Sequence, residues 1–201
     1  RTFSPLISAQ TEPGPGSLHP QQLRRAAACL KSGGILAYPT EAVYGLGGDP
    51  RREEAARRIL ALKRRPGAKG FILIAADLGQ LLPFIGDPSP EWLATPLSTW
   101  PGPFTWLLPS APSTPTWLRG AHDRIAVRIT VHPPARELCL AAGFPLISTS
   151  ANPTGSPPAR SPLRVRKYFP TGLDFILHGP LGGLARPTPI RDALSQVLVR
   201  G

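Results

Sequence analysis

The stretch Gly34-Ile-Leu-Ala-Tyr38-Pro-Thr-Glu-Ala-Val-Tyr44-Gly-Leu-Gly47 says more about the fold than any other part of the chain. An apolar run of strand length, residues 35–38, leads into Pro39, which has no N–H with which to extend a central ladder. Thr40 and Glu41 are therefore expected at a strand end, where open α/β sheets place their ligands. The glycines that follow favour either a positive φ or a close approach of the backbone to a ligand. From this stretch alone, an ordinary strand-to-helix turn is an equally good interpretation.

The composition is that of a globular chain of one domain. Of the 201 residues, 41% are hydrophobic and 17% are charged, and a chain of this length buries roughly 70% of its unfolded surface. The sequence has no apolar run near the roughly 20 residues that cross a bilayer. Its first residues lack the basic-then-apolar layout of a secretory signal. We therefore expect a cytoplasmic protein with no membrane partner.

The cysteines and histidines predict neither a disulfide nor a metal centre. Cys29 and Cys139 each lie among Ala and Leu in predicted helices, so buried thiols are favoured over a disulfide. The four histidines are scattered, and the sequence contains neither a CxxC nor an HExxH pair. We therefore expect that the protein itself holds no metal.

The charge is strongly basic and unevenly distributed. Lys and Arg number 23 against 12 Asp and Glu, a formal net charge of +11, and eight of the cations lie between Arg51 and Lys69. Such a cluster can be a solvated helix face, an RNA-binding surface or a pocket for polyphosphate. The charge alone does not choose among these.

The order of predicted elements indicates an α/β domain, of the α+β type, with a mixed sheet. Residues 1–17 are rich in Pro, Gly, Ser and Thr without periodicity, and predict a flexible tail ahead of a domain over 18–201. Helices are predicted over 20–33, 51–64, 134–142 and 162–168, with pieces in 77–100 interrupted by Pro83 and Pro96. Strands are predicted at 35–38, 71–75, 104–108, 124–129, 146–149, 175–177 and 196–200. Because no clear helix separates the strands 104–108 and 124–129, the sheet is not expected to be purely parallel.

Three cations near the end of the second helix are candidates for binding phosphate. The sequence contains no GxxxxGK[ST] loop, and its glycines do not have the GxGxxG spacing. A bound nucleotide would therefore be held mainly by side chains, and Lys63, Arg65 and Lys69 suit that role. Lys63 and Arg65 flank one residue at what is predicted to be an exposed, frayed helix end, so both can turn toward one ligand. A solvated helix end is the alternative.

Two further segments place polar groups beside apolar strands. Arg128 lies in the strand 124–129 among Ile, Ala and Val, where a guanidinium needs a carboxylate or phosphate partner; a structural ion pair is the alternative to a ligand. Ser148-Thr-Ser150-Ala-Asn152 follows an apolar strand, and its hydroxyls and amide can bind a carboxylate or phosphate without adding charge. A nucleophilic serine is disfavoured, since Ser150 lacks the GxSxG elbow and a recognisable histidine partner.

Five motifs in one order resemble the YrdC/TsaC family of threonylcarbamoyl-AMP synthases, over roughly residues 18–201. They are the stretch quoted above, Leu62–Pro66 with Lys69–Ala75, Trp100–Thr105, Ile125–Arg128 and Ser148–Asn152. The resemblance implies a twisted, mixed sheet with helices on both sides and a concave basic groove. It also implies that L-threonine, bicarbonate (or CO2) and ATP are converted to threonylcarbamoyl-AMP and pyrophosphate, with Mg²⁺ carried by the nucleotide.

The resemblance also implies roles for ten residues. Lys63 and Arg65 match the KxR element of the family and are expected to be catalytic. The nucleotide is expected to contact Lys63, Arg65, Lys69, Ser150, Asn152 and Arg200. Threonine is expected to contact Thr40, Arg128, Ser148 and Thr188. Two departures affect threonine recognition: Ala42 stands where many relatives have a second Thr, and Ile74 where some longer relatives have a His.

The resemblance further implies a downstream partner. The product would feed a separate threonylcarbamoyl transferase complex that modifies the adenosine beside the anticodon of certain tRNAs. The alternative is a non-catalytic RNA-binding maturation factor, although no RRM, KH or OB signature is present. With either function, the arginines of 51–58 could bind tRNA weakly through its phosphates.

Overall fold

The computed structural model describes residues 18–65, 69–86 and 88–200, except for the side chain of Arg200. The tail predicted over 1–17 lies outside these residues. Within them, no helix is both long enough and apolar enough to cross a membrane.

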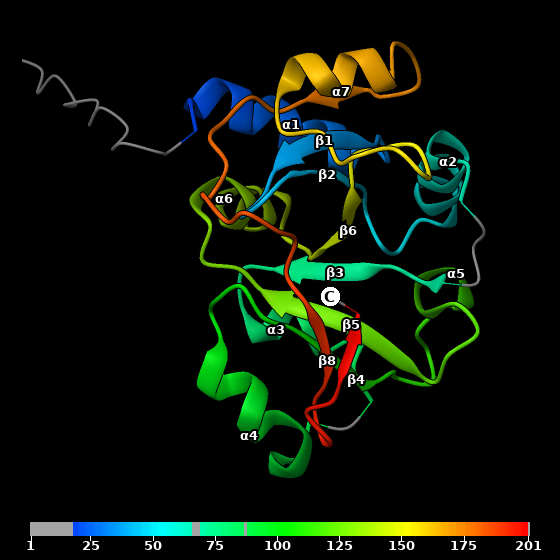
Figure 1. Ribbon diagram of the computed structural model, residues 1–201, viewed down its shortest axis with the longest axis vertical. Helices are drawn as coiled ribbons and strands as arrows, with labels where there is room; N and C mark the ends of the chain where they lie inside the picture. The colour runs from blue at the N-terminus through cyan, green and yellow to red at the C-terminus, as the bar shows by residue number, and fades with distance from the viewer. Residues whose placement is uncertain (1–17, 66–68, 87, 201) are drawn as a thin grey trace, which may run out of the picture.

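One mixed sheet organises this part of the chain (Figure 1). Its nine strands have the order β7-β1-β2-β6-β3-β5-β4-β8-β9. The strands are β1 (Leu36–Pro39), β2 (Tyr44–Gly47), β3 (Ile72–Ala75), β4 (Thr105–Pro109), β5 (Arg124–Ile129), β6 (Leu146–Ser150), β7 (Phe175–Ile176), β8 (Ile190–Asp192) and β9 (Leu198–Arg200). The pairs β1–β7, β3–β5 and β4–β8 are parallel and the others are antiparallel. The predicted mixed sheet is confirmed.

Helices cover both faces of the sheet. They are α1 (Pro20–Lys31), α2 (Glu53–Lys63), α3 (Leu78–Leu81), α4 (Pro90–Thr99), α5 (Thr116–Arg119), α6 (Pro133–Ala142) and α7 (Pro162–Tyr168). Alternate residues of a strand serve opposite faces. Leu73 of β3 belongs to the hydrophobic cluster that includes residues of α2, α4, α5 and α7, whereas its neighbour Ile74 belongs to the cluster formed with α1 and α6.

The opening stretch folds as a tight hairpin. Pro39 ends β1 opposite Tyr44 of β2, and residues 40–43 form the connection. The strand-to-helix turn is therefore wrong, although Thr40 and Glu41 do follow the end of a strand. Gly47 adopts no positive φ and lies instead against the ring of Tyr38, where an added Cβ would come within 2.8 Å of Cε1. The glycine thus makes room for a protein side chain.

The helix ends follow local sequence signals. Pro20 occupies the first turn of α1, and Gly33, with φ of +89°, follows its C-cap. Arg64 closes α2 in the left-handed conformation. The expected break at Pro96 is wrong, because this residue lies inside α4.

Candidate active site

A cavity of about 750 Å³ opens on the sheet face that carries α1 and α6. Ile72, Ala126 and Leu107 are direct cross-strand neighbours on β3, β5 and β4, and together they give it an apolar side. The residues of β5 alternate between the two faces: Ile125, Val127 and Ile129 enter the core, while Arg124, Ala126 and Arg128 line the cavity.

The cavity brings together nine of the ten residues singled out from the sequence. They are Thr40, Lys63, Arg65, Lys69, Arg128, Ser148, Ser150, Asn152 and Thr188. Arg200 belongs to β9, and its side chain lies outside the described part of the chain. Its neighbour Val199 lines the cavity. The roles of all ten residues remain predictions.

Lys63 is buried, so the exposed helix end predicted for it is wrong. Only 4% of the residue is exposed. Its Nζ donates to the carbonyl oxygen of Ser150 and, at 2.9 Å, to that of Asn152. The carbonyl of Lys63 in turn accepts from the N–H and the hydroxyl of Thr154, both at 2.9 Å. Lys63 therefore joins the end of α2 to the loop that follows β6.

Arg65 is half-buried and spans the same region. It donates from Nη1 to the hydroxyl of Thr149 at 3.2 Å and from Nη2 to the carbonyl of Gly70 at 2.8 Å. Its guanidinium lies 5.8 Å from the ring centroid of Phe71. Lys69 is exposed and directly precedes Gly70, whose carbonyl Arg65 contacts. The three predicted phosphate-binding cations therefore line the same end of the cavity.

Hydroxyl groups line the wall between β1 and β6. Tyr38 donates to Ser148 Oγ at 2.9 Å, and burial raises the pKa of Tyr38, which keeps this donor protonated. Thr40 donates to the carbonyl of Val43 at 2.7 Å within the hairpin loop. Ser148 and Thr40, two of the four residues expected to contact threonine, are thus oriented by hydrogen bonds inside the protein.

The structure pairs Arg128 with Glu41, as the ion-pair alternative required. Arg128 Nη2 lies 3.2 Å from Glu41 Oε2, and each side chain is 6% exposed. Thr130 donates to Glu41 Oε1 at 2.7 Å. On its other side, Arg128 Nη1 donates to Thr188, whose hydroxyl is 3.1 Å from that of Thr105. Arg128 Nε is buried and has no hydrogen-bond partner among the described residues.

Glu41, Thr105 and Thr130 were not among the residues predicted for the site. Glu41 stood in the opening stretch, and Thr105 ended the motif Trp100–Thr105. Their contacts with Arg128 or with each other join segments far apart in the chain. A single sequence shows the residue types here, but not these pairings.

The strap, residues 179–189, crosses the cavity side of the sheet and leads into β8 (Figure 1). Gly182 N donates to the carbonyl of Thr40 at 3.1 Å, and Leu184 N donates to that of Glu41 at 2.9 Å. His132 Nε2 lies 3.1 Å from the carbonyl of Pro180, and burial lowers the pKa of His132, which favours the neutral ring. The strap therefore carries Thr188 to Arg128 from an anchored start.

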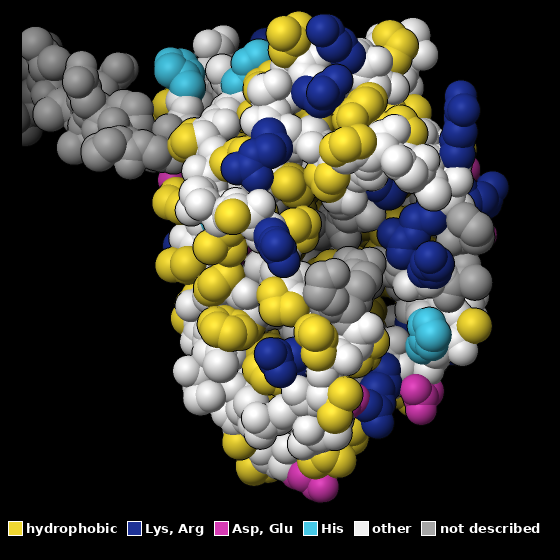
Figure 2. Space-filling model, in the orientation of Figure 1, with side chains coloured by type: hydrophobic (Ala, Val, Ile, Leu, Met, Phe, Trp, Pro, Cys, Tyr) yellow, Lys and Arg dark blue, Asp and Glu magenta, His cyan; other side chains and the backbone are white. Residues whose placement is uncertain are grey.

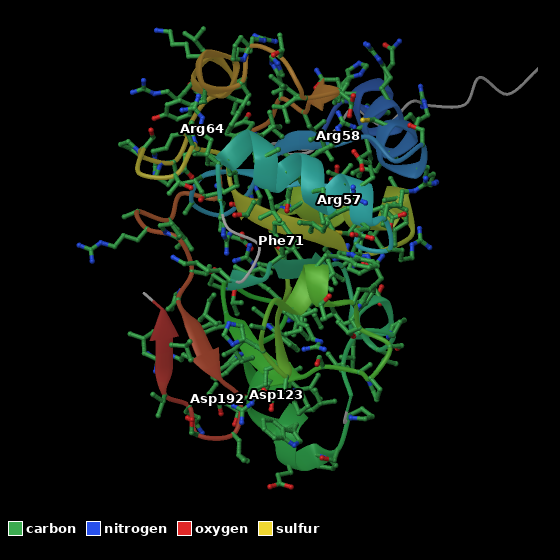
Figure 3. The ribbon with its side chains drawn as sticks, turned by 90° about the vertical axis from the view of Figure 1, so that its right-hand side faces the viewer. Arg57, Arg58, Arg64, Phe71, Asp123 and Asp192 are labelled. Atoms are coloured by element: carbon green, nitrogen blue, oxygen red, sulfur yellow. The ribbon has the colours of Figure 1, made fainter. Side chains whose placement is uncertain are left out.

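The arginines of α2 and of its N-terminal approach are largely paired with acids. Arg51 lies 2.7 Å and Arg52 3.8 Å from Asp49. Arg57 lies 3.4 Å from Glu53, and Arg58 lies 2.9 Å from Asp174. Figure 3 shows Arg57 and Arg58 along α2, with Phe71 between this helix and the lower half of the sheet. These pairs reduce the charge that this helix can offer to RNA.

The face drawn in Figure 2 is nonetheless basic. Lys and Arg side chains gather on its upper part and along its right side, with few Asp or Glu among them. The residues lining the cavity include six cations and two acids, the latter being Glu41 and Asp123. The concave basic groove implied by the resemblance is therefore present.

Comparison with known proteins gives the same family as the motifs. The Sua5/YciO/YrdC family model, described as telomere recombination, matches residues 28–200. The threonylcarbamoyl-AMP synthase of Halorhodospira halophila is 51% identical over 186 residues, which are 92% of this chain and 97% of that protein. The threonylcarbamoyl-AMP synthase of Pseudomonas aeruginosa is 51% identical over 175 residues, covering 87% of this chain and 94% of its own.

Solved structures agree. E. coli YciO superposes with a TM-score of 0.79 at 28% identity, covering 92% of this chain and 91% of its own. The Sua5 protein of P. abyssi, solved in complex with L-threonine, has a TM-score of 0.78 at 31% identity and covers 85% of this chain. This chain spans only 50% of that longer protein. The fold, the ordered motifs and these similarities show that the chain belongs to the Sua5/YciO/YrdC family.

Proposed function

We propose that the chain is a threonylcarbamoyl-AMP synthase, which makes threonylcarbamoyl-AMP and pyrophosphate from L-threonine, bicarbonate (or CO2) and ATP. The observation that carries this proposal is a single cavity lined by Lys63, Arg65 and Lys69 at one end and by Arg128 at the other. The three cations at one end suit the phosphates of ATP, and the guanidinium at the other suits the carboxylate group of threonine. Relatives about half identical over most of their length bear this enzyme name.

The chemistry needs no nucleophile from the protein. The threonine amine, after losing a proton, adds to CO2 and forms a carbamate. A carbamate oxygen then attacks the α-phosphorus of ATP, and the bond from that phosphorus to the bridging oxygen breaks, so pyrophosphate leaves. Holding the two substrates together and stabilising the phosphoryl charge supply the rate enhancement. Lys63 and Arg65 would provide that positive charge, and Ser150 and Asn152 would contact the nucleotide.

Threonine would bind at the Arg128 end. The unpartnered Nε of Arg128 and its Nη1, now bonded to the Thr188 hydroxyl, are donors suited to a carboxylate. A carboxylate accepts stronger hydrogen bonds from a guanidinium than a hydroxyl does. Ser148 and Thr40 would orient the rest of the amino acid. Ala42 lines the cavity, so the missing second hydroxyl removes a possible threonine contact there.

The second departure from the family has a different consequence. Ile74 is fully buried in the cluster formed with α1 and α6 and is not among the residues that line the cavity. Its side chain would therefore not contact threonine. Recognition of the amino acid at the Arg128 end does not depend on a histidine at this position.

Mg²⁺ would arrive with the nucleotide. The described residues contain no group of three or more His, Cys, Asp or Glu side chains able to hold a metal. Of the two lining carboxylates, Glu41 is engaged by Arg128 and Thr130, whereas Asp123 is exposed. One carboxylate together with phosphate oxygens and waters fits the usual coordination of Mg²⁺. The ion would neutralise charge on the phosphates.

The later steps follow from the product. Threonylcarbamoyl-AMP would pass in the cytoplasm to a threonylcarbamoyl transferase complex acting on tRNA. Any tRNA binding by this chain itself is expected to be weak and to fall steeply with salt. The arginines of residues 51–58 are paired with acids, which should reduce their contribution to tRNA binding. Replacing Arg51, Arg52, Arg57 and Arg58 with Gln measures that contribution. Retained tRNA binding in that variant would show that other residues bind the tRNA.

The decisive experiment measures pyrophosphate release by the purified chain. We expect release from ATP only when both L-threonine and bicarbonate are present, with omission of each as the control. L-Serine should support a slower reaction, because a pocket shaped for the extra methyl group loses roughly 1–3 kcal/mol without it. Equal release with either substrate omitted would refute the synthase proposal. Tight, salt-resistant and sequence-selective RNA binding without such release would favour the RNA-binding alternative.

A further inference from the structure

The Arg128 end of the cavity contains a buried pair of opposite charges. Glu41 Oε2 lies 3.2 Å from Arg128 Nη2, and both side chains are 6% exposed. Thr130 fixes the other carboxylate oxygen at 2.7 Å, and Thr130 itself is fully buried. The reaction proposed above assigns no step to Glu41. Its formal effect is to cancel the charge of the cation expected to bind the amino acid.

The opposite end of the cavity is built differently. The lining residues from the end of α2, from 69–72 and from 148–155 include three cations, Lys63, Arg65 and Lys69, and no Asp or Glu. The lining also includes Arg119, Asp123 and Arg124. Arg124 is paired with Asp192, and the charges of Arg119 and Asp123 offset each other, so the net positive charge lies with Lys63, Arg65 and Lys69. At the Arg128 end the charge is balanced by Glu41, so this end offers the N–H groups of Arg128 as hydrogen-bond donors without a net positive charge.

This asymmetry matters because both ends share one cavity. ATP and pyrophosphate carry several negative charges, so a guanidinium without a counter-charge would attract their phosphates as well as a carboxylate. A carboxylate 3.2 Å away cancels much of the attraction felt by an approaching anion. The directed N–H groups remain, and they suit an amino acid whose net charge is zero. Charge therefore selects the ligand that binds at the Lys63 end, and hydrogen-bond geometry selects the ligand that binds at the Arg128 end.

We propose that Glu41 is a specificity-determining residue that keeps polyphosphate out of the Arg128 end of the cavity. ATP is then confined to the end with Lys63 and Arg65, and threonine binds in one orientation relative to it. This inference rests on the proposed function, since it takes polyphosphate and an amino acid as the two ligands. The competing view is that Glu41 only holds the side chain of Arg128 in place.

Calorimetric titration of L-threonine, with and without saturating pyrophosphate at constant ionic strength, separates these views. In the unmodified chain, pyrophosphate should change the threonine Kd by less than about twofold. In Glu41→Gln, pyrophosphate should weaken threonine binding by about tenfold or more. This magnitude follows from proton-binding equilibria, which a charge within about 4–6 Å shifts by roughly 10- to 1,000-fold. Thr130→Val is the matched control, because it removes a hydrogen bond to Glu41 but keeps the charge, and it should behave like the unmodified chain.

Glu41→Gln leaves Arg128 without its carboxylate partner, so a second variant is used in case this one does not fold. Glu41→Asp keeps a carboxylate but withdraws it by one methylene, so pyrophosphate should weaken threonine binding to an intermediate extent. Competition in the unmodified chain would overturn the inference. So would its absence from both folded Glu41 variants, or a Thr130→Val variant that behaves like Glu41→Gln. Failure of the unmodified chain to bind L-threonine would instead refute the proposed function.

Discussion

Replacing Lys63 with Met should destabilise the protein as well as slow its release of pyrophosphate. The substitution keeps the aliphatic stem and removes the ammonium group that donates to the carbonyls of Ser150 and Asn152. A hydrogen bond from a charged donor contributes about 1.5–3 kcal/mol. Losing both, with some relaxation of the loop, should lower the free energy of unfolding by about 3 kcal/mol. For a domain of this size, that corresponds to a Tm lower by about 6–12 °C.

Thermal melting without ligands, in parallel with pyrophosphate release, measures the two effects separately. Lys69→Met is the matched control, because Lys69 lines the same cavity but is exposed. Its Tm should stay within about 2 °C of the unmodified chain, since exposed substitutions usually change stability by less than 0.5 kcal/mol. A Lys63→Met variant that melts like Lys69→Met would refute the idea that this buried ammonium holds the loop after β6.

Three further predictions test the site and the core. Arg128→Gln should weaken L-threonine binding at least about tenfold and change ATP binding by less than about twofold in calorimetry; a collapse of the melting transition would show that the pair with Glu41 is structural instead. Because burial lowers the pKa of His132 below 6.5, the unfolded chain takes up a proton there before the folded chain does, so the Tm should fall as the pH drops below about 6.5. His132→Gln should lose part of that decline, and an unchanged pH profile would exclude this histidine as its source. Burial raises the pKa of Cys29 to about 11 and that of Cys139 to about 12, so a thiol reagent at pH 8 should react slowly with the native protein and rapidly with two thiols in guanidinium; rapid reaction of the native protein would contradict their protected state.

Local patterns predicted most of the architecture. The helices α1, α2, α6 and α7 and the strand β5 lie close to their predicted bounds, because apolar periodicity and Pro or Gly at the ends are properties of short segments. The strand β2 was missed. Its sequence, Tyr-Gly-Leu-Gly, has weak strand propensity, and its place between β1 and β6 compensates for that.

The environment of the site residues depended on distant segments. Lys63 is buried by a loop 87 or more positions further along the chain, so the sequence around α2 could not reveal its burial. The need of Arg128 for an anionic partner was predictable from its apolar strand. Its partner Glu41, however, lies far earlier in the chain, in the connection between β1 and β2. Residue types at strand ends located the cavity, and long-range pairing decided how each side chain is held.

The strand β6 has a consequence for the order in which the chain can fold. It pairs with β2 on one side and with β3 on the other, and β7, which lies still later in the chain, completes the sheet beside β1. Ser148 is 110 positions from the Tyr38 hydroxyl that it accepts from. During N-to-C-terminal synthesis, the β1–β2 hairpin must therefore wait for most of the chain before either edge is paired. A growing chain that ends before residue 146 carries Thr40, Glu41 and Lys63 but has no site.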